Sequence, residues 1–295
     1  MPYPIDHKTR LDCIYRYYLN NDVKFKIIKY LYNRELALLT PSWVKYPFMK
    51  KKSIRNLRVH NTQFLDSTLT VTRLLCPGYR TFINFYYSLA VFGDGIPFKD
   101  LKIFTRDTKL WNKKANARII SYDFLLDIDA GSHEDWDFCK YSAEIIKKVY
   151  DALKVPYSLR FSGKGWHFVT PYKYLPQYYS MNPLDRNNIY SFLLKIARFF
   201  YNHHSQMVDL KIYDSRRVIK IPYTLAIYED EDYICTPMAS HKMFEEFKLD
   251  DYRAGNILIN IREAPVDYIF NSTGNFMNLV KFIEKIEGDK YFENG

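Results

Sequence analysis

The chain has 295 residues, of which 47% are hydrophobic and 26% charged, and this excludes a wholly disordered chain, a collagen-like chain and a disulfide-stapled mini-protein. Forty-three Lys and Arg against 33 Asp and Glu give a net charge of +10, which favours polyanionic partners such as nucleic acid or nucleotides.

The cysteine pattern and the hydropathy further limit the kind of protein that the chain can be. Four cysteines lie far apart and form no CxxC pair, so no zinc site is expected: Cys13, Cys76, Cys139 and Cys235. The best uncharged stretch, residues 81–92, is too short to cross a bilayer. We therefore expect a cytoplasmic protein with reduced thiols and no membrane partner.

The N-terminal part is predicted to be a helical layer over about residues 1–60. Apolar residues recur every three or four positions over residues 11–31 and again over 32–39, with a break at residues 20–22 and an end at Pro41.

Residues 41–60 form the most basic segment. They include no acidic residue, and their cations are interleaved with Trp43, Tyr46 and Phe48. A second basic group, Lys109, Lys113 and Lys114, stands beside Trp111. Phosphate contacts combined with base stacking would suit this mixture, and a solvated basic face is the alternative. The candidate nucleic-acid-binding residues are Lys45, Lys50, Lys51, Lys52, Arg55, Arg58, Lys113 and Lys114.

The centre of the chain alternates between strand and helix patterns. Strands are predicted over residues 119–128, 157–161, 167–171, 217–221 and 233–235, residues 81–92 fit a helix or a strand, and helices are predicted after Ser132 and around residues 189–200. From about residue 241 to 295 the pattern is mostly helical. With no repeat, linker or composition break, we expect one α/β (α+β) domain over residues 1–295, with a central mixed sheet and flanking helices.

Three segments carry residues suited to catalysis. The first ends a buried strand, where the alternation of side chains turns Asp127 and Asp129 to the same face. Two carboxylates side by side repel each other unless a cation neutralises them, and their hard oxygens suit Mg²⁺ or Mn²⁺. A solvated strand end is the alternative.

The second segment is the glycine turn of residues 162–165, followed by His167. Gly163 and Gly165 would let the backbone approach an anion, while Ser162, Lys164 and His167 offer donors to phosphate. The spacing is not that of a P-loop, and an ordinary glycine hairpin is the alternative.

The third segment, residues 208–222, offers further acidic residues, Asp209 and Asp214, followed by cations. On a strand, Arg217 and Lys220 would face opposite sides. By itself this segment is most simply a charged edge strand.

In this order the three segments resemble the archaeo-eukaryotic primase superfamily over about residues 119–225. Asp127-Ile128-Asp129 resembles the DxD metal motif, and residues 162–167 resemble the S-G-x-x-G-x-H nucleotide motif with one residue fewer. Residues 209–225 are similar to the archaeal small-subunit pattern in which an aspartate precedes D-x-x-R-h-h-R-h-P-x-S-L. That pattern implies Asp209, rather than Asp214, as the third carboxylate. Two departures are Ala226, which stands where the pattern often continues to a histidine, and the lack of a zinc-knuckle motif.

The resemblance implies a DNA primase or primase-polymerase that makes primers on a single-stranded DNA template from nucleoside triphosphates. Asp127, Asp129 and Asp209 would hold Mg²⁺ or Mn²⁺, and a primase large subunit or a helicase would be a partner. The implied nucleotide-binding residues are Ser162, Gly163, Lys164, Gly165, His167, Arg217 and Lys220, with Arg217 alternatively orienting the carboxylates. Two other functions stay open: an end-joining or translesion polymerase that only extends primers, and a catalytically idle nucleic-acid-binding module.

Overall fold

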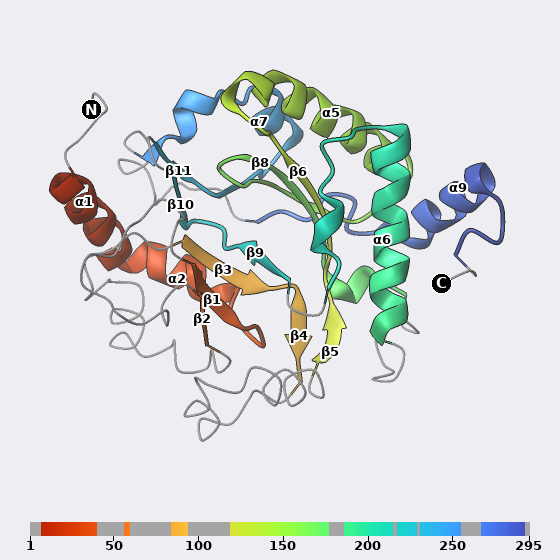
Figure 1. The fold of residues 1–295 in the computed structure, drawn as a ribbon, viewed down its shortest axis with the longest axis horizontal. Coiled ribbons are helices and arrows are strands. Elements are labelled where there is room, and N and C mark those ends of the chain that lie inside the picture. The colour runs from red at the N-terminus through yellow and green to blue at the C-terminus, as the bar shows by residue number, and fades with distance from the viewer. Residues whose placement is uncertain are drawn as a thin grey trace.

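The computed structural model describes residues 7–39, 56–59, 84–93, 119–176, 186–214, 217–228, 231–254 and 267–292, and the strands among them form two four-stranded sheets and two strand pairs (Figure 1). The first sheet has the order β2 (Asn56–Val59), β1 (Leu36–Leu39), β3 (Asn84–Ser88) and β9 (Val218–Lys220). The second has the order β12 (Thr236–Pro237), β7 (Ser158–Phe161), β8 (Gly165–Thr170) and β6 (Phe124–Asp129). The two pairs are β10 (Leu225–Ile227) with β11 (Asp232–Ile234), and β4 (Ala90–Phe92) with β5 (Ile119–Tyr122).

The α/β class predicted from the sequence is confirmed, while the arrangement of the sheets differs from the one expected. Every ladder between these strands is antiparallel, so the described residues form no parallel pair. The strands also divide among several sheets. The division arises because a single residue interrupts each long strand pattern: Leu89 separates β3 from β4, and Asp123 separates β5 from β6.

These two interruptions are tied together. The amide of Asp123 donates to the carbonyl oxygen of Leu89 over 3.0 Å. Arg34 lies over the same point, because its guanidinium donates to the Leu89 carbonyl at 2.7 Å and pairs with the buried Asp123 carboxylate at 2.7 Å. The other Asp123 oxygen accepts from the amide of Tyr172. These hydrogen bonds and this ion pair hold together the two points where the chain leaves the first four-stranded sheet and enters the second.

The helical N-terminal layer is shorter than predicted. Helices α1 (His7–Leu19) and α2 (Asn21–Lys29) are present, and their break is at Asn20, whose side chain accepts from the Asp22 amide and caps α2. The next apolar run forms β1 instead of a helix, so the prediction for residues 32–39 is wrong. A run of four apolar residues fits a buried strand equally well, and β1 pairs with β2 on one edge and β3 on the other.

Two long helices flank the second sheet (Figure 1). Helix α5 (Trp136–Ala152) buries Cys139, Ala143 and Ile146 and packs on β6 and β8. Its last turn places the ring of Tyr150 between Phe168 of β8 and Phe200 of helix α6 (Arg186–His203), 5.4 and 5.7 Å away. Pro156 follows the helix, as the sequence predicts.

The C-terminal part, predicted to be mostly helical, combines helices with non-helical stretches such as residues 267–276, where Phe270 forms a bridge with Tyr157. It contains α7 (His241–Glu245), a 3-10 turn (Leu249–Tyr252) and α9 (Met277–Glu287), and α9 contacts α6. The hairpin of β7 and β8 and the helix around residues 189–200 also form as predicted, and of the two alternatives for residues 81–92, helix or strand, the described residues 84–92 form strands. No helix in the described ranges is long and apolar enough to span a membrane.

Candidate active site

Asp127 and Asp129 lie at the end of β6, whose apolar side chains are buried. They alternate with Leu126 and Ile128, both fully buried, so the two carboxylates share the opposite face as predicted. On β8, His167 is the register partner of Asp127 and Gly165 is the partner of Asp129. Antiparallel pairing therefore brings the end of the glycine turn directly beside the two aspartates.

Asp209 reaches the same place from the other edge of β6. The amide of Asp129 donates to the carbonyl of Met207 at 3.3 Å, and the amide of Asp209 donates to the carbonyl of Asp127 at 2.9 Å. Between these bonds, Ile128 and Val208 form an antiparallel bridge. Asp127, Asp129 and Asp209 are hereafter the carboxylate cluster. This pairing involves Asp209 and not Asp214, whose side chain is exposed.

Burial and the like charges of its members disfavour the ionised form of the carboxylate cluster. Burial, followed by the charges of Asp129 and Asp209, raises the pKa of Asp127 well above its usual range. Burial also raises the pKa of Asp129, although the charge of Lys164 opposes this. The buried Oδ1 of Asp127 has no hydrogen-bond partner among the described residues. A cation bound to these oxygens would relieve both effects, and hard carboxylate oxygens are the donors that Mg²⁺ and Mn²⁺ prefer.

The carboxylates do not face one common point. Within the described ranges, no group of three or more His, Cys, Asp or Glu side chains is arranged to hold a metal ion. Asp209 explains this, because its Oδ1 accepts from the amide of Lys211 at 2.8 Å and its Oδ2 lies 3.3 Å from the guanidinium of Arg217. The oxygens are of the kind that a hard divalent cation prefers, but among the described residues they are not arranged to hold one, and Arg217 and the Lys211 amide bind the Asp209 side chain.

His167 lies against the carboxylate of Asp127 rather than at the glycine turn. Its Nε2 is 3.4 Å from Oδ1 of Asp127, and the side chain is buried. Burial and the charges of Arg160, Lys220 and Arg217 lower the pKa of His167 well below its usual range. The imidazole is therefore neutral at pH 7.

The glycine turn is built by contacts within the protein. The hydroxyl of Ser162 accepts from the amides of Lys164 at 3.3 Å and Gly165 at 2.9 Å, which fixes the turn. A Cβ on Gly165 would lie 1.9 Å from the carbonyl oxygen of Ile128, and one on Gly163, at φ +94°, would lie 2.2 Å from Cβ of Ala226. Both glycines thus permit close packing against protein atoms, where the sequence suggested approach to an anion. The turn leaves the Lys164 side chain exposed.

Arg217 and Lys220 approach the cluster from the side of β9. Arg217 contacts Asp209, as in the alternative role considered for it. Lys220 is buried, with its ammonium 5.3 Å from the ring centre of Tyr86 and 5.5 Å from that of Tyr228. Its charge lowers the pKa of Asp129 against the larger effect of burial. Tyr86 and Tyr228 were not predicted as site residues, because nothing in their local sequence shows that β3 and the end of β10 meet at β9.

The predicted nucleic-acid-binding residues fall almost entirely outside the described residues. Arg58 is the exception: it lies on β2, where its backbone is the register partner of Ala37 on β1. The others lie in ranges that are not described: Lys45, Lys50, Lys51, Lys52, Arg55, Lys113 and Lys114. Their role stays a prediction.

Comparison with known proteins finds a similarity in structure only. No family model matches the chain, and no curated protein matches it in sequence. Among solved structures, the chain is similar to the polymerase domain of ligase D from Mycobacterium tuberculosis in complex with DNA. The two are 10% identical, the match covers 85% of this chain and 92% of the other, and the TM-score is 0.44.

Proposed function

We propose that this chain is a metal-dependent nucleotidyltransferase that adds nucleotides to a growing strand on a single-stranded DNA template. The observation that carries the proposal is the backbone pairing of residues 207–209 with β6, which sets Asp209 beside Asp127 and Asp129. Burial, together with the charge of Asp209, raises the pKa of both Asp127 and Asp129, and groups with perturbed pKa values gather at functional sites.

In the proposed reaction the 3′-hydroxyl of a primer or first nucleotide attacks the α-phosphate of a nucleoside triphosphate. The new P–O bond forms as the bond to the leaving pyrophosphate breaks, and the proton of the hydroxyl passes to solvent water. Mg²⁺ or Mn²⁺, when bound by Asp127, Asp129 and Asp209, would supply positive charge next to the attacking and leaving oxygens. Arg217 holds the Asp209 side chain, and the exposed Lys164 stands where it can pair with the phosphates.

His167 takes a different part from the one expected of a phosphate ligand. Because it is buried and neutral against Asp127, we assign it to orienting that carboxylate through the 3.4 Å contact. Lys220, held between two tyrosine rings, supplies fixed positive charge behind Asp129. The net charge of +10 suits the nucleic-acid template.

The test is incubation of the chain with single-stranded DNA, Mn²⁺ or Mg²⁺, and ribo- or deoxyribonucleotides, with and without an annealed primer. Products with the primer and without it support a primase-polymerase. Products only with the primer support an end-joining or translesion polymerase that uses the same cluster. Metal-dependent DNA binding with no product under any condition would overturn the enzymatic proposal in favour of the idle binding module.

A further inference from the structure

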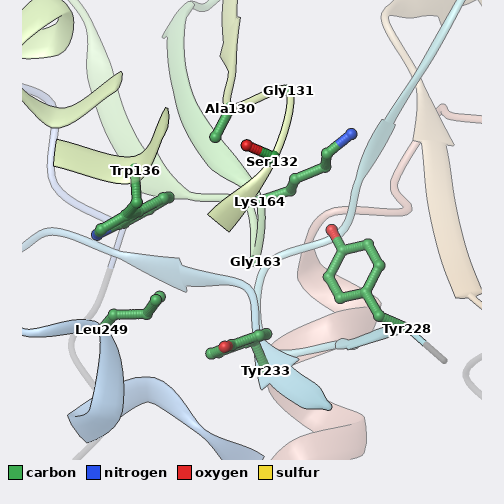
Figure 2. A pocket seen from close by; sticks show the side chains of 9 residues that line it. All are labelled: Ala130, Gly131, Ser132, Trp136, Gly163, Lys164, Tyr228, Tyr233 and Leu249. Carbon is green, nitrogen blue, oxygen red and sulfur yellow. The ribbon is translucent and has the colours of Figure 1, made fainter. Parts of the chain in front are cut away.

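A pocket opens where the residues after β6 meet the glycine turn (Figure 2). Its volume is about 220 Å³. Ala130, the residue after Asp129, lies on its wall, and the amide of Ala130 donates to the carbonyl of Lys164 at 3.2 Å. Gly163 and Lys164 line the pocket as well. The pocket and the cluster therefore share one wall, formed where the end of β6 meets the glycine turn.

Aromatic rings form much of the remaining wall of this pocket, which we call the aromatic pocket. Figure 2 shows Trp136 and Leu249 on one side and Tyr228 on the other, with Tyr233 between them. Trp136 is held in place by stacking on Trp166, with ring centres 6.1 Å apart and planes at 28°. Tyr228 is held by the ammonium of Lys220 over its ring. Rings fixed by their neighbours offer flat apolar surfaces at little entropic cost on binding.

The pocket also has polar groups. They include the hydroxyl of Ser132, which donates to Asp135, the exposed ammonium of Lys164, and the hydroxyls of Tyr228 and Tyr233. Burial, with smaller effects from Tyr86 and Asp129, raises the pKa of Tyr228 well above its usual range, so its phenol stays neutral and can donate a hydrogen bond. The charge of Lys164 acts on both Asp127 and Asp129. A ligand that contacts both the rings and Lys164 would have a flat aromatic part and an anionic part.

The volume limits how much of that ligand enters. Sites for whole drug-sized ligands measure about 300–1,000 Å³, so this pocket has room for one ring system and not for a complete nucleoside triphosphate. The rest of the ligand would extend past Lys164 toward the cluster.

We infer that the aromatic pocket binds the nucleobase of the nucleotide whose phosphates are bound at Lys164 and the carboxylate cluster. The inference rests on the proposed function, since it takes the ligand to be a nucleotide. It adds that the rings of Trp136 and Tyr228 contact the flat faces of the base, a contact that every base can make and that leaves selection of the base to pairing of its edge with the template.

Two substitutions of one wall residue test this assignment. Leu249 is partly exposed in a short 3-10 turn, so Leu249→Trp should fill the pocket without disturbing the sheets, while Leu249→Ala should enlarge it. Phe138→Trp is the matched control, because Phe138 is 56% exposed on the outer face of α5 and adds the same ring away from the pocket. Binding is measured for three probes, each with Mn²⁺: a nucleoside triphosphate, the same nucleoside, and inorganic triphosphate.

Leu249→Trp should weaken binding of the nucleoside triphosphate about 5- to 150-fold, the range for loss of one base-stacking contact, and leave inorganic triphosphate binding unchanged. Phe138→Trp should change neither. Equal loss for both triphosphates, or no loss for either, would overturn the assignment of the pocket to the base. Nucleoside binding without any effect of Leu249→Trp would place the base elsewhere and overturn it too.

The same samples separate this inference from the proposed function. If the wild-type chain extends a primer and Leu249→Trp leaves the KM for nucleotide unchanged, the pocket assignment fails while the proposed function stands. If the wild-type chain binds nucleotides yet incorporates none on any template, the proposed function fails, while the effect of Leu249→Trp on nucleotide binding still decides the pocket assignment.

Discussion

The backbone amide of Asp209 donates a 2.9 Å hydrogen bond to the carbonyl oxygen of Asp127, and this bond ties the third carboxylate to the strand that bears the other two. Because it is a backbone bond, it survives substitution of either side chain. Variants of the three aspartates therefore change the charge of the site while the pairing of the two segments is kept.

Asp127→Asn and Asp129→Asn should each reduce nucleotide incorporation more than about 100-fold, because each removes a proposed metal ligand. Neither should lower the melting temperature of the metal-free protein, since burial and like charges raise the pKa of both groups and make their ionised forms unfavourable. Calorimetric titration with Mn²⁺ should show weaker binding in both variants. Full activity in either one would remove that residue from the site.

The stability contributed by Asp127 should depend on pH with a defined sign. Its folded pKa is raised above the unfolded value near 3.8, so this contribution is fully present below pH 3.8 and is lost as the pH rises through the folded pKa. Denaturant unfolding of the metal-free wild type and Asp127→Asn should show the wild type losing stability relative to the variant over that window. A relative gain with rising pH would contradict the assigned cause. Added Mn²⁺ should stabilise the wild type more at high pH, because metal binding requires the deprotonated form.

Gly165→Ala should destabilise the fold by about 1–3 kcal/mol or more, because the new Cβ would overlap the Ile128 carbonyl and push β8 away from β6.

Gly163→Ala is compared with Gly288→Ala as its control. Both glycines have φ near +100°, but nothing lies within 4 Å of a Cβ at Gly288. Gly163→Ala should cost more than this control, and adding Ala226→Gly should recover part of the excess. Urea unfolding measures all four variants. Equal costs at Gly163 and Gly288 would show that packing against Ala226 is unimportant.

Lys164→Ala should raise the KM for nucleotide about 10- to 150-fold, since a charged hydrogen-bond donor to phosphate is lost, and should barely change template affinity. Lys242→Ala, at another exposed lysine, should change neither quantity. Nucleotide is titrated at fixed template, then template at fixed nucleotide. Loss of template affinity with normal nucleotide saturation would assign the glycine turn to the DNA surface instead.

Arg217→Ala should lower kcat and raise the Mn²⁺ concentration needed for activity, with little change in the KM for nucleotide, if Arg217 acts by holding Asp209. Arg217→Lys should restore part of kcat, because a cation remains near Oδ2 of Asp209. A rise in the KM for nucleotide alone would instead make Arg217 a direct phosphate ligand, as the family pattern implies.

The sequence was sufficient for the parts of the site that depend on local alternation. Strand periodicity placed Asp127 and Asp129 on one face, and the glycine turn between β7 and β8 followed from its flanking apolar runs. The choice of Asp209 over Asp214 came from the resemblance to a family pattern, because no local feature distinguishes the two. Its position beside Asp127 depends on a bridge between distant segments.

Other features depend on contacts that no local pattern encodes. The apolar residues 36–39 fit helix and strand alike, and pairing with β2 and β3 decides for the strand. The glycines at 163 and 165 suggested a phosphate contact, yet Ala226 and Ile128 are what require them. The tyrosines around Lys220 come from β3 and from the end of β10, which meet only in the folded chain.

The most direct test of the central claim compares Asp209→Asn with Asp214→Asn in Mn²⁺-dependent primer extension at saturating nucleotide and template. Both variants lose one carboxylate of the same segment, and Asp209 is the one whose backbone amide donates to the carbonyl oxygen of Asp127. The three-carboxylate site predicts at least about a 100-fold loss for Asp209→Asn and near wild-type extension for Asp214→Asn. Near wild-type extension by Asp209→Asn would contradict it.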